Sequence, residues 1–386
     1  MTIGFASRAV VSTCALCAAG MLVLAPAAAT TGTGVDPGPR ATAVSASLLY
    51  RPGTHVRPRP GAPEVPTLSA RAWLVADART GEVLAAHDAH RRLAPASTLK
   101  TLFALTVLPI LPAGITHRVT AEELAGIGPG SSLVGVAENR GYRVSDLWNG
   151  VFLSSGNDAV RVLAELSGGW RATARRMQAK ARALGARDTR VTSPDGYDAP
   201  GQVSSAFDLA VFGRAGLRNP EFARYCAREE ARFPARDGGS YGIRNTNRLL
   251  TGAEGVAPYR GLVGIKNGYT SNAGNTLVAA ARRDGRTLVA TVMNPRAGDG
   301  FAVYEEARSL LDWGFEAAGR VDPVGSLDAL RTGPLRGPEA ESAAVPVRRD
   351  DGPGRTVPWT IAGAALLGGA GTALFLRLRW GPVPAD

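Results

Sequence analysis

The sequence predicts an α+β fold in which strands from both ends of the folded region form one antiparallel β-sheet. Two observations support this prediction. Residues 70–86 and 276–293 are rich in β-branched and other apolar residues and are each divided by turn-forming residues, which is typical of hairpins. The region between them contains several segments with apolar residues at helical spacing. We therefore expect the first and last strands to pair, with a mainly helical insert between them.

The first hairpin is expected to turn at Asp77 and Gly81, because both residue types favour turns. A helix should follow from Pro95, since proline suits the first turn of a helix and leucines recur after it at helical spacing. Further helices are predicted at residues 145–152, 157–166, 172–184 and 204–213.

The second hairpin consists of predicted strands at residues 276–282 and 287–293. Asp284 and Gly285 between them are a strong turn signal. A closing helix is expected at residues 304–315, where apolar residues again follow helical spacing.

The first 29 residues have the layout of a secretory signal peptide. Arg8 precedes an apolar stretch at residues 9–25, and small residues lead to a cleavage position after Ala29. A retained N-terminal anchor is the alternative interpretation. Cleavage would leave Cys226 as the single cysteine of the mature chain, so no intramolecular disulfide is expected.

A membrane anchor is predicted near the C-terminus. Residues 357–376 carry no charge, and twenty helical residues match a hydrocarbon core of about 30 Å. Because Arg377 and Arg379 follow directly, the tail at residues 377–386 should stay in the cytoplasm. The chain is therefore expected to be a single-pass protein of the cell membrane, with its folded domain outside the cytoplasm.

Two linkers are predicted to flank the folded domain. Residues 30–66 and 319–356 are rich in Pro, Gly and Arg and show neither helical nor strand periodicity. The domain between the linkers then covers residues 67–318.

Composition limits the partners and the chemistry. The net charge of +11 suits an anionic lipid or wall polymer, but no Lys/Arg-rich run is interleaved with aromatic residues, so no nucleic-acid partner is expected. All four histidines occur at or before residue 117, which limits metal sites and histidine-based triads. We expect no metal and no cofactor.

The string Ser97-Thr98-Leu99-Lys100 is the first candidate catalytic motif. Residues three apart on a helix share a face, so the Ser97 hydroxyl and the Lys100 ammonium can meet. Backbone N–H groups at a helix start can hold an oxyanion, and a desolvated lysine can take the hydroxyl proton. Only three of the 44 cationic residues are lysines, and lysine, unlike arginine, can lose its proton. The alternative is a helix cap followed by a solvated lysine.

Two further polar motifs follow along the chain. In the turn before a predicted helix, Ser155 could relay protons and Asn157 could bind a substrate amide, or the turn could be a cap based on Asp158. On a predicted strand, Lys266 offers a charge to a carboxylate, and Gly268 lets a substrate backbone approach the strand edge. The alternative is an ordinary strand end running into a turn.

In this order, the three motifs resemble those of the penicillin-recognising serine acyl-transferases. The stretches LAPASTLKTL, SSGNDA and GIKNGYTSNAGNTLVAAARRDGRTLVATVMN are similar to the low-molecular-mass D-alanyl-D-alanine carboxypeptidases. The resemblance covers about residues 67–315. It implies a β-lactamase/transpeptidase-like architecture: an antiparallel sheet flanked by helices, with a helical subdomain across a cleft.

The resemblance also implies a reaction. Ser97 would attack the bond between the two terminal D-alanines of a peptidoglycan stem peptide and release the last one. Water would then hydrolyse the acyl-enzyme, and β-lactams would acylate the same serine as inhibitors. Lys100 would be the base, and Ser155, Asn157 and Lys266 would complete the catalytic set.

The end of the third motif would bind the substrate. The backbone N–H groups of Ser97 and Tyr269 would form the oxyanion hole. The residues implied in substrate binding are Asn267, Gly268, Tyr269 and Thr270. The family's usual threonine is replaced by Asn267, so the hydroxyl normally offered to the substrate carboxylate is missing; Thr270 or an arginine such as Arg296 could replace it.

Other functions fit the sequence less well. Ser240 lies in a Gly-x-Ser-x-Gly string, but that mechanism needs a histidine after the serine, so we interpret the string as a flexible loop. Between Asn157 and Asp208 the only glutamate is Glu165, two turns into a predicted helix, which argues against rapid β-lactam hydrolysis. An endopeptidase or transpeptidase of the same fold, or a catalytically weak protein that binds the wall or β-lactams, stays open as an alternative.

Overall fold

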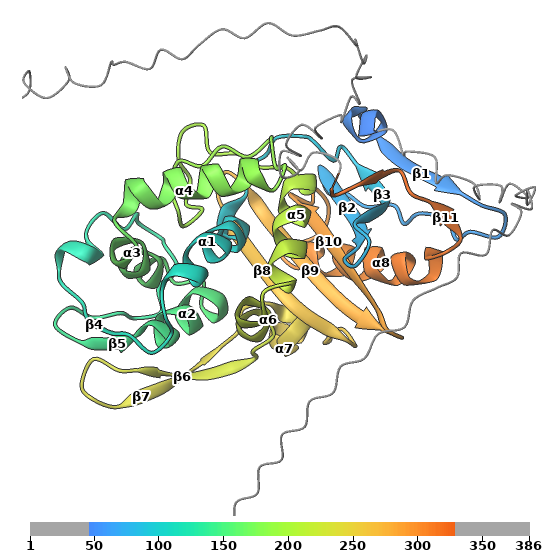
Figure 1. The fold of residues 1–386 in the computed structure, drawn as a ribbon. Coiled ribbons are helices and arrows are strands. Elements are labelled where there is room, and N and C mark those ends of the chain that lie inside the picture. The colour runs from blue at the N-terminus through green and yellow to red at the C-terminus, as the bar shows by residue number, and fades with distance from the viewer. Residues whose placement is uncertain (1–45, 329–386) are drawn as a thin grey trace, which may run out of the picture. The chain divides into compact units, whose positions relative to one another are not determined.

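The computed structural model describes residues 46–328 of the chain (Figure 1). Its centre is an antiparallel sheet in the order β11-β1-β3-β2-β10-β9-β8, with β12 paired to β3. The strands of this sheet are β1 (Thr54–Pro58), β2 (Ala72–Asp77), β3 (Glu82–His87), β8 (Leu262–Thr270), β9 (Gly274–Arg283), β10 (Arg286–Met293), β11 (Val321–Asp322) and β12 (Gly325–Ser326). The α+β class is confirmed.

Both predicted hairpins form. After β2, the Asp77 carboxylate accepts the backbone N–H groups of Arg79 at 2.8 Å and Thr80 at 3.0 Å, which fixes the turn into β3. Between β9 and β10, Asp284 and Gly285 both have positive φ, as a two-residue hairpin turn requires. Strand β10 pairs with the whole of β2, so the first and last hairpins join in one sheet as predicted.

Helices cover both faces of the sheet. Leu74 belongs to the core that includes residues of α1 (Lys100–Val107) and α5 (Ala206–Leu217), and the next residue, Val75, belongs to the core beneath α8 (Ala302–Ala317). Successive strand residues point to opposite faces, so a strand buried on both faces must be apolar throughout. Residues 72–76 of β2 are accordingly all apolar and all buried.

The remaining elements are grouped mainly at one side of the sheet, beyond β8 (Figure 1). The α-helices are α2 (Val144–Leu153), α3 (Asn157–Leu166), α4 (Trp170–Ala183), α6 (Pro220–Cys226) and α7 (Arg248–Thr251). Two short hairpins accompany them: β4 (Thr116–Arg118) with β5 (Gly141–Arg143), and β6 (Glu230–Pro234) with β7 (Ser240–Arg244). The 3₁₀ segments are η1 (Ala46–Tyr50), η2 (Ala96–Leu99), η3 (Leu108–Ile110), η4 (Glu122–Leu124) and η5 (Ala253–Gly255).

The predicted limits of the folded domain are too narrow. Elements η1 and β1 lie inside the segment predicted as a linker at residues 30–66, and β11 and β12 lie inside the one at 319–356. Strand β1 pairs with β3 and β11, although none of its residues is buried. An exposed strand carries no apolar alternation, and two-residue strands are too short for any periodicity, so the sequence pattern could not reveal them.

The rejected Gly-x-Ser-x-Gly string also differs from the prediction. Ser240 begins β7 and pairs with Pro234 of β6, so the flexible-loop interpretation is wrong for this residue. The Arg232 guanidinium donates to the Ser240 hydroxyl across the hairpin.

The signal peptide, the membrane span and the cytoplasmic tail that the sequence predicts all lie outside the described residues. Within residues 46–328, the structure contains no helix long and apolar enough to cross a bilayer.

Candidate active site

Ser97 lies in η2, directly before α1. The residue before it, Ala96, has a φ of +49°, a conformation that costs energy for any residue other than glycine and is common at functional sites. The loop at residues 193–201 closes on this turn. A Cβ at Gly196 would lie only 2.1 Å from the Ala96 carbonyl oxygen, so glycine is required there. The backbone at Ser97 is thus held in an unusual conformation by a close neighbour.

The Lys100 ammonium is buried and donates three hydrogen bonds. Its acceptors are Ser97 Oγ at 2.8 Å, Asn157 Oδ1 at 2.7 Å and the Asp195 carbonyl oxygen at 2.6 Å. Burial lowers the pKa of Lys100 from 10.5 to about 8, because desolvation outweighs the opposing charges of Asp195 and Asp158. A lysine with this pKa is partly neutral near pH 7 to 8, and the neutral form can accept the Ser97 proton.

The second motif lies beside Lys100. Asn157 accepts from Lys100 and donates through Nδ2 to Ser131 Oγ at 3.1 Å. Ser155 has a φ of +57°, is 7% exposed, and its hydroxyl has no hydrogen-bond partner. A buried hydroxyl without a partner costs energy, so it needs a functional reason, and a proton relay during the reaction would supply one.

Asp158 makes this turn rigid. Its carboxylate accepts the backbone N–H groups of Val134, Gly135 and Val136, at 3.0, 2.8 and 2.9 Å. It also lies in the first turn of α3, where a negative charge is favourable. The helix-cap interpretation therefore applies to Asp158, and the functional interpretation of Ser155 and Asn157 stays a prediction.

Strand β8 brings the third motif against η2. A Cβ at Gly268 would lie 2.7 Å from the Ser97 backbone nitrogen, so only glycine allows this approach. Lys266, two residues earlier on the same face of the strand, is 1% exposed and donates to the Asn267 carbonyl oxygen at 2.8 Å. Burial, and then the charge of Lys100, hold the pKa of Lys266 well below 10.5. Two buried lysines in one site suit a substrate that brings a carboxylate.

The Asn267 side chain lies between Lys266, whose Nζ donates to Asn267 Oδ1 at 3.4 Å, and Tyr304 of α8. Its Nδ2 donates to the Thr246 carbonyl oxygen and to the Tyr304 hydroxyl, each at 3.2 Å. Its Oδ1 accepts from the Thr246 hydroxyl at 3.1 Å. Both amide hydrogens are thus engaged within the protein, so Asn267 does not offer the free donor that a threonine hydroxyl would.

A cavity of about 160 Å³ opens at the nucleophile. Ser97 and Asn157 line it together with Tyr269 and Thr270 from the end of β8. Tyr269 is 66% exposed, whereas the Thr270 hydroxyl is tied to Asp198 Oδ1 at 2.7 Å. All nine residues predicted for the site lie on η2, the start of α1, the turn before α3, the first residue of α3 or β8.

Sequence reasoning missed several groups at the site. Ser131, Tyr197 and Asp198 line the cavity, the Asp195 carbonyl accepts from Lys100, and Thr246 bonds Asn267. Most of them lie on loops. The composition of these loops predicts turns but does not predict a place in the active site. No spacing rule connects residues 193–198 to a serine almost a hundred positions earlier.

The arrangement supports acyl transfer by a serine nucleophile. A hydroxyl, a buried lysine bonded to it, and a second buried lysine on the facing strand supply a nucleophile, a base and an anion partner. Among residues 46–328, no three His, Cys, Asp or Glu side chains are grouped as a metal site would require.

Comparison with known proteins agrees with this chemistry. The family model for D-alanyl-D-alanine carboxypeptidases, peptidase S11, matches residues 59–297. The D-alanyl-D-alanine carboxypeptidase DacB2 of Mycobacterium tuberculosis is 39% identical over 70% of this chain and 89% of its own. DacD of Escherichia coli, which carries the same enzyme name, is 34% identical over 66% of this chain and 65% of its own. The crystal structure of penicillin-binding protein 6B from Escherichia coli is 33% identical, with a TM-score of 0.60, over 68% of this chain and 82% of its own.

Proposed function

Because the chain belongs to the S11 peptidase family of serine-type D-alanyl-D-alanine carboxypeptidases, we propose that it removes the terminal D-alanine from peptidoglycan stem peptides through an acyl-enzyme on Ser97. The observation that carries this assignment is the 2.8 Å hydrogen bond between Lys100 and Ser97 Oγ. It joins the hydroxyl to a buried lysine whose pKa, about 8, suits a base near neutral pH.

Acylation begins with neutral Lys100. Lys100 Nζ takes the proton of Ser97 Oγ as that oxygen attacks the carbonyl carbon of the penultimate D-alanine. The backbone N–H groups of Ser97 and Tyr269 hold the resulting oxyanion. When the intermediate collapses, the peptide C–N bond breaks and the leaving amine takes a proton that Ser155 relays. Free D-alanine departs, and the rest of the peptide stays as an ester on Ser97.

Deacylation uses the same base with water as the nucleophile. Lys100 is neutral again once its proton has left with D-alanine, and it can accept a proton from the attacking water. The ester C–O bond breaks and the proton returns to Ser97 Oγ. Asn157 and the Asp195 carbonyl keep the lysine in place through both steps, since each is bonded to its ammonium.

The substrate carboxylate is recognised at the Lys266 end of β8. Lys266 provides the positive charge, since Lys100 is neutral when it acts as the base. Asn267 acts in the substrate site by holding Thr246 and Tyr304 in place, because its own donors are engaged with them. Gly268, Tyr269 and Thr270 then present a strand edge along which the peptide backbone lies.

We also propose that β-lactams inhibit the protein by acylating Ser97 in the same way. The test is labelling of the full-length protein with a fluorescent penicillin, beside Ser97→Ala and Thr98→Ala. Label should attach to the wild type and to Thr98→Ala, and a labelled Ser97→Ala protein would refute the assignment of the nucleophile.

We further propose that the protein is exported and anchored in the cell membrane with its catalytic domain outside the cytoplasm. The signal-peptide layout of residues 1–29 and the uncharged segment at 357–376 support this. The full-length chain should sediment with membranes, and a chain ending at residue 356 should appear in the soluble exported fraction. Equal partitioning of the two chains would contradict the anchor.

A further inference from the structure

A groove on the surface of the described domain is lined by four arginines and takes no part in the reaction proposed above. Its volume is about 760 Å³, and the four residues are Arg92, Arg182, Arg187 and Arg190. They come from three segments: the loop after β3, the end of α4 and the loop that follows α4. We call this hollow the arginine groove. Guanidinium groups that surround one hollow concentrate positive potential in it.

Most of this charge is not neutralised within the protein. Three of the four side chains are exposed and form neither an ion pair nor a side-chain hydrogen bond with the described residues: Arg182, Arg187 and Arg190. The carboxylate in the described lining belongs to Asp188, which is only 9% exposed. It accepts from His90 Nδ1 at 2.7 Å and lies 3.7 Å from the Arg92 guanidinium. Asp188 is thus engaged with neighbours and leaves the other three arginines without a counter-charge.

The positive charge continues from the groove along α4. No acidic residue occurs between Glu165 and Asp188, whereas six cationic residues do. Gln178 and Arg182 of α4 line the groove, and Arg171 and Arg175 follow on the same helix face, seven and three residues before Gln178. One helical turn rises about 5.4 Å, so the exposed arginines of this face are spaced by one to two turns.

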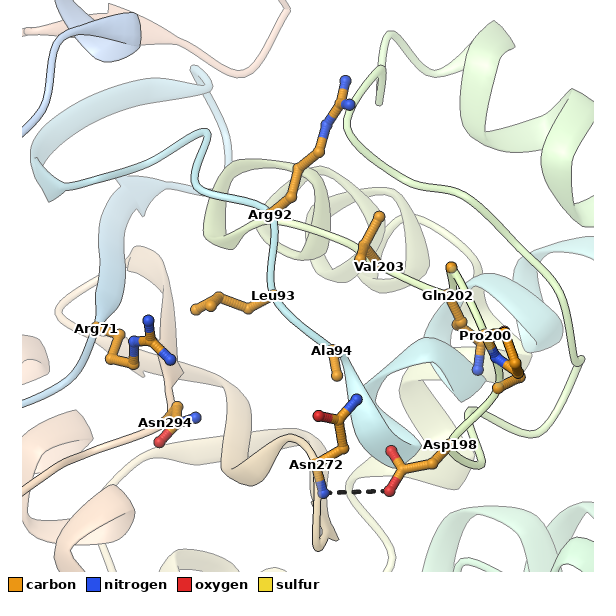
Figure 2. Close-up of a pocket in the computed structure, with 12 residues that line it drawn as sticks. Arg71, Arg92, Leu93, Ala94, Asp198, Pro200, Gln202, Val203, Asn272 and Asn294 are labelled. Atoms are coloured by element: carbon orange, nitrogen blue, oxygen red, sulfur yellow. Dashed lines mark hydrogen bonds between the residues drawn. The ribbon is translucent and has the colours of Figure 1, made fainter.

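The groove is continuous with the catalytic cavity through a space of about 590 Å³ that lies between them. This space shares Arg92 and Val203 with the arginine groove and Asp198 with the catalytic cavity. Figure 2 shows the Arg92 side chain pointing away from Asp198 and Asn272. A ligand held in the groove is therefore close to the route by which a substrate reaches Ser97.

We propose that the arginine groove, with the arginine face of α4, binds an anionic polymer of the cell wall whose backbone is linked by phosphodiesters. Guanidinium groups bind phosphate oxygens through two parallel hydrogen bonds. A row of arginines one to two helical turns apart suits a chain that carries a charge in every repeat, and a phosphodiester backbone does so. This site goes beyond the proposed function, because it holds the protein on the wall and leaves the reaction at Ser97 unchanged.

A bilayer of anionic lipids is the other partner with this charge. Helices that lie on such bilayers also insert large apolar side chains. In the described part of the chain, the exposed large hydrophobic residues are Tyr50, Ile110, Ile115, Leu133, Tyr241 and Tyr269. None of these six lies on α4 or lines the groove. A hollow without apolar anchors fits a linear polymer better than a flat lipid surface.

The test measures the binding of fluorescently labelled poly(glycerol phosphate) to the full-length protein in micelles of a nonionic detergent. The groove variant combines Arg182→Gln, Arg187→Gln and Arg190→Gln. The control variant combines Arg57→Gln, Arg236→Gln and Arg260→Gln, three exposed arginines outside the groove that form no ion pair within residues 46–328. Both variants lose the same net charge, so a difference between them reports the position of the charge.

In fluorescence anisotropy at low salt, the Kd of the groove variant should rise about thirtyfold, which is about threefold for each exposed arginine–phosphate pair. The slope of log Kd against log salt concentration should fall by about two, because each lost phosphate contact removes about 0.7. The control variant should keep its Kd within about twofold of the wild type. Equal losses in the two variants, or an unchanged Kd in the groove variant, would overturn the site.

Two further measurements complete the test. Micelles that contain phosphatidylglycerol, at a lipid phosphate concentration equal to that of the polymer, should leave the polymer bound; displacement would overturn the polymer assignment in favour of a lipid surface. Thermal unfolding checks that both variants are folded, and Arg187→Gln alone should raise Kd about threefold if the triple variant is not. None of these measurements involves D-alanine release, so their outcome is independent of the proposed function.

Discussion

At the scale of single residues, the choice between lysine and arginine carries much of the functional information. Lys100 and Lys266 are both about 1% exposed, whereas Lys180 lies exposed on α4. A buried arginine could not give up its proton, so only lysine can act as a base at position 100. In a chain this rich in arginine, the sequence alone was enough to select these two lysines. The sequence could not show that Lys100 is held by hydrogen bonds to the Asp195 carbonyl oxygen and to Asn157.

The pH dependence of D-alanine release should report Lys100. Its pKa in the folded protein is lowered to about 8, so the fraction of neutral base rises with pH up to that value. We expect kcat/KM to rise about tenfold per pH unit below 8 and to level off above it, in initial rates from pH 5.5 to 9.5. Lys100→Arg should be inactive at every pH, and Lys180→Arg should follow the wild-type curve. A flat wild-type profile would be inconsistent with lysine as the base.

The replacement of the family's threonine by Asn267 also has a measurable consequence. Because both amide hydrogens of Asn267 are engaged with Thr246 and Tyr304, Asn267→Thr should add a hydroxyl donor for the substrate carboxylate. We expect KM for a peptide ending in D-Ala-D-Ala to fall about tenfold, with little change in kcat. The same peptide with a C-terminal amide is the control and should show no gain. An unchanged KM for the free acid would show that the hydroxyl is not needed here.

At the scale of elements, the helices and hairpins with strong periodicity could be predicted, and the weakly patterned segments could not. Helix α3 has the predicted bounds, and β9 and β10 lie within two residues of theirs. Strand β1 was missed because it is exposed. The role of the loop at residues 193–201 was missed because its turn-forming composition does not show that it contacts Ala96. That loop contacts Ala96, and β8 contacts η2. Glycines allow both contacts, but a glycine in the sequence does not show which distant segment will approach it.

Gly268 tests how closely β8 must approach the nucleophile. In Gly268→Ala, the added Cβ would lie 2.7 Å from the Ser97 nitrogen and 3.0 Å from the Thr98 nitrogen, so one of the two elements must shift. A displacement near 1 Å at a reacting group costs about a hundredfold in rate, and we expect kcat/KM to fall by about that factor. Gly242→Ala in β7 meets no atom within 4 Å and serves as the control. Wild-type activity of Gly268→Ala would show that the contact is unimportant.

At the scale of the whole molecule, the sheet assembles a site from segments that are distant in sequence. Pairing of β10 with β2 joins the two ends of the described chain, and β9 then carries β8 to the edge beside Ser97. The helical side contributes Ser155 from the turn before α3 and Asn157 from the first position of α3. We expect the net charge of +11 to attract the protein to an anionic wall polymer, and salt should weaken this attraction. In the proposed reaction, catalysis therefore depends on one nucleophile, Ser97, which segments from both ends of the described chain position.

The most direct test of that claim is release of free D-alanine from a pentapeptide ending in D-Ala-D-Ala, measured for the wild type, Ser97→Ala and Ser240→Ala. Ser240 is the control because it lies in the rival Gly-x-Ser-x-Gly string, on β7. We predict that the wild type and Ser240→Ala release D-alanine at the same rate and that Ser97→Ala releases none. Release by Ser97→Ala, or its loss in Ser240→Ala alone, would contradict the assignment of Ser97 as the nucleophile.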